Sequence, residues 1–163
     1  MKLKITGRQA IEAFAREPFA PHTALISITD SDSDFAALEH QPEHLLQLRF
    51  DDITSQDAQE EFEHQRGRKP TEEEQHLLAE KFHLISDAQA AEIAAFVHQV
   101  KDSAALLICQ CEYGESRSAA VAAAVIELFQ GSGIMVFADD RYYPNKLVYR
   151  MVYEALRESP EIC

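Results

Sequence analysis

The stretch LLICQCEYGESRSAAVAAAV, residues 106–125, decides the fold of this chain. It begins as a short apolar run that ends at Cys111, and from Ser118 onward it is an almost wholly apolar, helix-forming sequence. A buried strand followed by a buried helix is typical of a parallel sheet, because such sheets are covered on both faces. The connecting turn, CEYGESR, therefore lies at the carboxyl edge of the strands, where α/β proteins place their binding sites.

Five short runs are predicted as strands. Thr23–Thr29 and Ala105–Cys111 are nearly continuous apolar runs, as expected for strands buried on both faces. The others are Lys2–Thr6, expected at an edge, Leu45–Phe50 and Ile134–Phe137.

Helices are predicted between these runs from apolar periodicity and from capping residues such as Ser86 and Thr71. Their ranges are Gly7–Arg16, Thr71–Phe82, Ser86–Val100, Glu115–Gln130 and Asn145–Glu158. The alternation predicts a three-layer α/β fold with a mainly parallel sheet of four to five strands flanked by helices. Residues 1–163 are expected to form a single domain with a polar helical insertion at about 55–83. We interpret that insertion as a solvated excursion, with a lid or substrate-selecting element as the alternative.

Composition limits the partners and the compartment. The chain has 163 residues and 28 acidic against 15 basic side chains, for a net charge of -13. Nucleic acid and anionic membranes repel such a surface, so neither is expected as the main partner. Three cysteines do not make a disulfide framework, and no signal peptide or membrane-spanning run is recognised. A cytoplasmic location is therefore expected.

The turn CEYGESR has the composition of an anion-binding loop. Successive backbone N–H groups of Glu112–Arg117, at the positive end of a buried helix, are expected to cradle a phosphate, sulfate or vanadate ion. Gly114 would let the backbone approach the ligand, and Arg117 would add a two-pronged donor. The same field favours the thiolate form of Cys111, an in-line nucleophile, and Ser118 could donate a hydrogen bond to it. A core cysteine followed by a chance arginine is the alternative, and we assign Cys109 to that core role.

This loop resembles the signature Cys-(x)5-Arg-Ser/Thr of the cysteine-dependent protein tyrosine phosphatases. The order of parts is similar to the compact dual-specificity branch, in particular to small bacterial members, which also show LRFDD-like and PN-containing segments. Here these are residues 48–52 (LRFDD) and 143–148 (YPNKLV), and the resemblance runs from about Thr23 to Arg150. It implies a phosphatase-like fold with Cys111 as nucleophile, Arg117 as phosphate clamp and Ser118 as partner of the thiolate. The implied activity is hydrolysis of a phosphate monoester, of the phosphotyrosine-protein type, through a phosphocysteine.

A general acid is expected after the strand Leu45–Phe50, which ends directly in Asp51 and Asp52. A carboxylic acid there could protonate the leaving oxygen from the side opposite the sulfur. We favour Asp51, which is nearer the strand end, with Asp52 second. The alternative is that both carboxylates cap the polar segment that follows.

Departures from the family pattern bear on the substrate. Gln110 stands where the family has His, and Glu112 and Glu115 would put negative charge at the entrance, with Tyr113 as a cleft wall. These features favour a singly phosphorylated protein or a small phosphomonoester over polyanions.

No metal or other cofactor is expected. The histidines are scattered without ligand spacing, and the acidic run at residues 30–34 lacks the glycine and glutamate of a calcium loop. We interpret that run as a solvated turn.

Two other classes of protein have a similar anion-binding loop that begins with a cysteine. A catalytically weak phosphatase-like module would bind phosphorylated partners without turnover, and the acidic loop favours it. Sulfur transferases usually have shorter loops, whereas an arsenate reductase would need Cys109 or Cys163 as a resolving thiol.

Overall fold

Four parallel strands form a central sheet in the order β1-β4-β2-β3. The strands are β1 (Lys2–Gly7), β2 (Thr23–Thr29), β3 (His44–Arg49) and β4 (Leu106–Cys111) in a computed structural model that describes residues 1–159. The two most apolar runs, β2 and β4, pair with each other at the centre, with Ile26 opposite Cys109. The more polar strands β1 and β3 occupy the edges of the sheet. The predicted edge position of β1 is confirmed.

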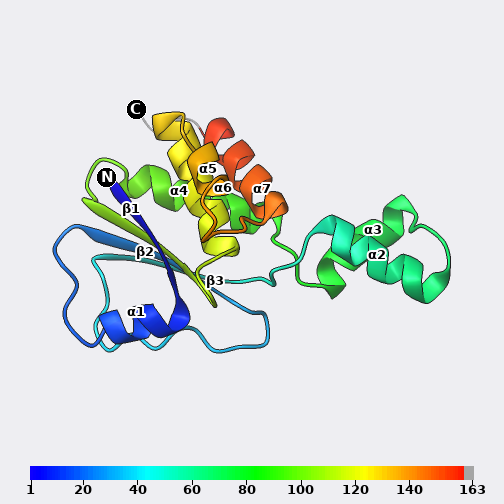
Figure 1. Ribbon diagram of the computed structural model, residues 1–163, viewed down its shortest axis with the longest axis horizontal. Helices are drawn as coiled ribbons and strands as arrows, with labels where there is room; N and C mark the ends of the chain where they lie inside the picture. The colour runs from blue at the N-terminus through cyan, green and yellow to red at the C-terminus, as the bar shows by residue number, and fades with distance from the viewer. Residues whose placement is uncertain (160–163) are drawn as a thin grey trace.

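Helices cover both faces of this sheet. One face carries α4 (Asp87–Val100), α5 (Arg117–Gln130), the short α6 (Ile134–Phe137) and α7 (Lys146–Glu158), and the other carries α1 (Arg8–Phe14) (Figure 1). The side chains of β4 divide between the layers as the two-residue period of a strand requires. Leu107 and Cys109 pack into the main core under α4, α5 and α7, whereas Ile108 packs with Ile11 of α1. The predicted three-layer, parallel α/β fold is confirmed.

Helix α5 is the most deeply buried helix of the molecule, and its residues 117–125 are all buried. Small alanine side chains allow it to lie close to β4 and α7. Val121 and Val125 are fully buried, and burial of a side chain of this size contributes about 1.5–3 kcal/mol. Gly131, with φ of 64°, ends the helix in the left-handed conformation that glycine adopts without strain.

The predicted fifth strand at Ile134–Phe137 is wrong, because this segment is the single helical turn α6. Val136 packs on Ala119 and Ala123 of α5, while Ile134 and Met135 are 67% and 66% exposed. A four-residue apolar run is too short for its periodicity to separate strand from helix.

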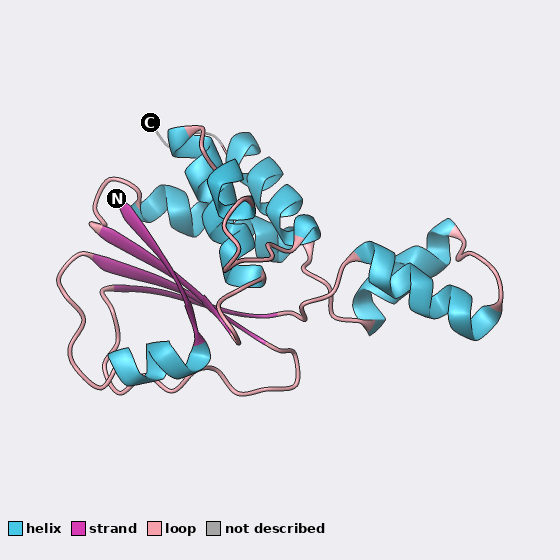
Figure 2. Ribbon diagram, in the orientation of Figure 1, coloured by secondary structure: helices cyan, strands magenta, loops and turns pink. Residues whose placement is uncertain are grey.

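Between β3 and α4 the chain forms a helical hairpin of α2 (Ser55–Arg66) and α3 (Glu72–Lys81). Each helix begins with a capping box, Thr54 with Asp57 and Thr71 with Glu74, and Gly67 turns the chain at φ of 70°. The hairpin projects away from the sheet (Figures 1 and 2), and its helices contact each other more than any other described element.

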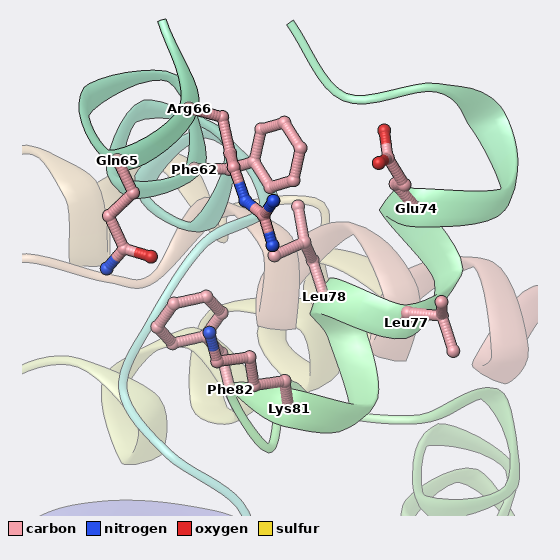
Figure 3. Close-up of a pocket in the computed structure, with 8 residues that line it drawn as sticks. All are labelled: Phe62, Gln65, Arg66, Glu74, Leu77, Leu78, Lys81 and Phe82. Atoms are coloured by element: carbon pink, nitrogen blue, oxygen red, sulfur yellow. The ribbon is translucent and has the colours of Figure 1, made fainter. Parts of the chain in front are cut away.

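A hydrogen bond closes the base of this hairpin: the N–H of Asp51 donates to the carbonyl oxygen of His83 over 2.8 Å. The helix predicted at Thr71–Phe82 is confirmed. A cavity of about 230 Å³ lies between α2 and α3 (Figure 3), and Cys111 is not among the residues that line it. Its lining combines apolar and charged side chains: Phe62, Gln65, Arg66, Glu74, Leu77, Leu78, Lys81 and Phe82.

Replacement of residues 55–82 by a short Gly-Ser linker should leave the sheet and its helices folded. The hairpin is stabilised by its own caps, and the Asp51–His83 bond already brings its ends together. We expect the free energy of unfolding, measured by urea denaturation, to change by less than about 1 kcal/mol. Loss of the cooperative transition would show instead that the hairpin is part of the main core.

Candidate active site

Cys111 is the last residue of the central strand β4 and is 2% exposed. Its Sγ lies 3.1 Å from Oγ of Ser118, a buried residue in the first turn of α5. The turn between β4 and α5 folds back, so that the strand ends beneath the N-terminus of the helix. The thiol of Cys111 and the hydroxyl of Ser118 therefore lie close together.

The turn is held from outside by its carbonyl groups. The carbonyl oxygen of Glu112 accepts from the N–H of Arg8 (2.9 Å), and that of Glu115 accepts from the N–H of Tyr143 (2.8 Å). The carbonyl of Ser116 accepts from the N–H groups of Ala120 and Asn145. Within residues 1–159, the N–H groups of residues 113–116 make no hydrogen bond to the protein. Three carbonyl groups of the loop are therefore occupied while four of its N–H groups are free, an arrangement suited to binding an anion.

The backbone around Gly114 leaves no room for a side chain at this position. Its φ is 73°, and a Cβ added there would lie 2.5 Å from the carbonyl carbon of Thr6 and 2.6 Å from the nitrogen of Gly7. The glycine is required because the end of β1 crosses the loop there.

Arg117 is 3% exposed, so its guanidinium is buried. Its Nη1 donates to the carbonyl oxygen of Phe50 at 2.7 Å and forms an ion pair with Oδ1 of Asp30, also at 2.7 Å. Its Nε is buried and has no partner among the described residues. The interpretation of Asp30 as part of a solvated turn missed this ion pair; a carboxylate directly after a central strand was the available signal.

The two candidate acids point to different partners. The carboxylate of Asp51 accepts from the N–H and Oγ of Ser31, at 2.8 and 3.1 Å. Oδ1 of Asp52 accepts from Oγ of Ser116 at 2.7 Å and from Nδ2 of Asn145 at 2.9 Å. Asp52 is thus bonded directly to the loop that contains Arg117, whereas Asp51 is bonded to the segment after β2.

Gln110 and Cys109 both belong to the core. Oε1 of Gln110 accepts from Oγ of Ser27, and its Nε2 donates to the carbonyl of Cys111 at 2.9 Å. The glutamine therefore fixes the backbone at Cys111, as the resemblance expects of a histidine there. Burial, with the nearby Cys111 as a further cause, raises the pKa of Cys109 to about 12. Cys109 consequently remains a thiol, as a core cysteine should.

Glu112 is neutralised by a pair that sequence reasoning did not find. Its Oε2 accepts from Nε of Arg8 at 2.8 Å, so it adds less negative charge to the entrance than we expected. Tyr113 and Glu115 are exposed. The part of the chain that the structure describes holds no cluster of three or more His, Cys, Asp or Glu side chains suited to a metal ion.

The overall fold resembles that of human DUSP28, a dual-specificity phosphatase of known crystal structure. The superposition has a TM-score of 0.51, covers 95% of this chain and 91% of that chain, and matches at 18% sequence identity. The chain therefore has a dual-specificity-phosphatase-like fold. At the level of sequence, no protein-family model and no curated protein matches it. None of the helices in residues 1–159 is both long and apolar enough to span a membrane.

Gly114→Ala should destabilise the protein by at least about 2 kcal/mol in urea denaturation, since it combines a left-handed φ with a backbone clash. The matched control is Gly67→Ala, at φ of 70° with nothing within 4 Å of the added Cβ. The control should cost only the conformational penalty of about 1 kcal/mol. Equal losses in both variants would contradict the role given to the close approach of β1.

Proposed function

We propose that this protein is a phosphatase that hydrolyses phosphate monoesters through a phosphocysteine intermediate. The observation that supports it best is the loop 111–118, in which a thiol, four free N–H groups and an unpartnered guanidinium Nε occur together. A tetrahedral dianion would satisfy all of these donors at once, which no group of the described chain does.

In the proposed reaction, the N–H groups of the loop and Arg117 bind the phosphate with its phosphorus above Sγ of Cys111. The thiolate attacks in line, an S–P bond forms and the P–O bond to the leaving group breaks. Ser118 stabilises the thiolate before attack and again as it leaves. Water then cleaves the S–P bond, which releases inorganic phosphate and regenerates the thiolate.

Asp52 is the general acid in this proposal, in place of the first-ranked Asp51. Asp52 contacts Ser116, the neighbour of Arg117, so its carboxyl group is tied to the phosphate loop. Asn145 orients the same carboxylate and also caps α7. Protonated, Asp52 would give its proton to the leaving oxygen and, as a carboxylate, would activate the water of the second step.

The proposed substrate class is a singly phosphorylated protein, with phosphotyrosine the best fit, or a small phosphomonoester. A chain of net charge -13 with an exposed Glu115 at the loop disfavours polyanions. An exposed Tyr113 offers an aromatic surface beside the loop. We also propose a cytoplasmic location. We further propose membership in the compact bacterial branch, on the basis of the LRFDD and YPNKLV segments.

Cys111→Ser should abolish turnover of p-nitrophenyl phosphate, because a serine hydroxyl is not ionised at neutral pH. It should retain tungstate binding, measured by calorimetry, because the N–H groups and Arg117 remain. Cys109→Ala is the matched control, since it removes the other thiol of β4, and it should keep the activity of the folded protein. Unchanged turnover in Cys111→Ser would overturn the proposal, and tungstate binding without turnover in the wild type would favour the phosphate-binding module.

Asp52→Asn should lower kcat by about 10²–10³-fold for phosphotyrosine, whose leaving oxygen needs a proton. The loss should be smaller for p-nitrophenyl phosphate, because p-nitrophenolate leaves without protonation. Asp51→Asn, the neighbouring control, should cost less and show no such dependence on the leaving group. The reverse ranking in steady-state kinetics would assign the acid to Asp51.

A further inference from the structure

We infer that Asp30 is a positioning residue, which holds the guanidinium of Arg117 so that one side of it faces the bound anion. This inference rests on the proposed function, because it gives Arg117 the task of binding phosphate. Asp30 acts through Arg117 and itself touches no reacting atom.

The argument starts from the hydrogen-bonding capacity of the guanidinium. Nη1 has two partners: it donates to the carbonyl oxygen of Phe50 and forms an ion pair with Oδ1 of Asp30, each at 2.7 Å. These two contacts anchor the Nη1 end of the guanidinium. The planar fork then leaves the side formed by Nε and Nη2 for a ligand, and Nε has no partner in the described protein. A phosphate accepts two parallel N–H bonds from such a side.

The position of Asp30 suits this task. It follows Thr29, the last residue of the central strand β2, so a rigid element carries it to the carboxyl edge of the sheet. Its side chain is 39% exposed, whereas Arg117 is buried. The carboxylate therefore supplies a counter-charge to a buried cation while remaining partly hydrated, which lowers the cost of burying the guanidinium.

The Asp30–Arg117 pair affects the orientation of the guanidinium rather than its electrostatic attraction for the anion. Asp30 offsets the charge of Arg117, so it does not increase the electrostatic attraction of the loop for a dianion. Its contribution is to the direction of the fork, and small errors in direction lower the rate strongly. Loss of Asp30 should consequently reduce turnover more than it raises KM.

The test compares Asp30→Ala, Asp30→Asn and Asp30→Glu with the wild type. Asp30→Ala removes both bond and charge, and we expect kcat for p-nitrophenyl phosphate to fall about 10- to 100-fold and tungstate affinity to weaken. Asp30→Asn keeps an oxygen beside Nη1 and removes only the charge, so it should recover most of that loss. Asp30→Glu keeps the charge but moves it by one methylene, so it should remain impaired. Asp32→Ala, in the same turn and exposed, is the matched control and should behave as the wild type.

Thermal unfolding is measured alongside, at assay temperatures where every variant is folded. Wild-type kcat and tungstate affinity in folded Asp30→Ala, or in Asp30→Glu should the alanine variant not fold, would overturn the inference. Equal kinetic losses in Asp30→Ala and Asp30→Asn would also overturn it, because the accepting oxygen would then be irrelevant. Tungstate binding needs no turnover. A protein that binds tungstate in an Asp30-dependent way but hydrolyses nothing would thus contradict the proposed function while supporting the role of Asp30.

Discussion

The buried guanidinium of Arg117 is the interaction on which the rest of the site depends. It sits in the first turn of α5 and bonds to Asp30 after β2 and to the backbone of Phe50 after β3. One side chain therefore joins the ends of two strands to the start of the buried helix. A buried cation without these partners would be strongly destabilising, so the three segments have to meet there.

The loop between Cys111 and Ser118 is shaped mainly by what bonds to its carbonyl groups. Arg8 reaches it from the end of β1, and Tyr143 and Asn145 reach it from the segment before α7. Gly114 allows β1 to pass within van der Waals distance. These contacts occupy the carbonyls of Glu112, Glu115 and Ser116, while the N–H groups of residues 113–116 make no hydrogen bond within the described chain. Such preorganised donors cost no rearrangement during a reaction, which is why they are effective in catalysis.

The α2–α3 hairpin is organised on a different principle from the sheet body. Its helices begin at two capping boxes and share a thin apolar contact, whereas the body is stabilised by a continuous core under α4, α5 and α7. The fold is similar to that of human DUSP28 at only 18% identity, which is possible because a layered core preserves a fold through many substitutions as long as its pattern of apolar positions persists. Helix α2 of the hairpin begins at Ser55, three residues after Asp52, so the hairpin is close along the chain to the proposed acid.

The sequence by itself determined the local elements and the contents of one continuous loop. Strand β4, helix α5 and the neighbours Cys111, Arg117 and Ser118 could be predicted because period, capping and spacing are properties of adjacent residues. The assignment of Ile134–Phe137 failed since four residues carry no distinguishable period.

Only the tertiary structure decided which distant side chains meet. Arg8 and Glu112 are 104 residues apart, and Arg117 and the carbonyl of Phe50 are 67 apart. Nothing local marks such pairs, so the neutralised Glu112 and the contrast between Asp51 and Asp52 were beyond the reach of sequence reasoning, and the place of Asp30 after a strand did not identify Arg117 as its partner. The side chains of successive residues along a strand point to opposite faces of the sheet, and the partner that each side chain reaches depends on the packing of the whole fold.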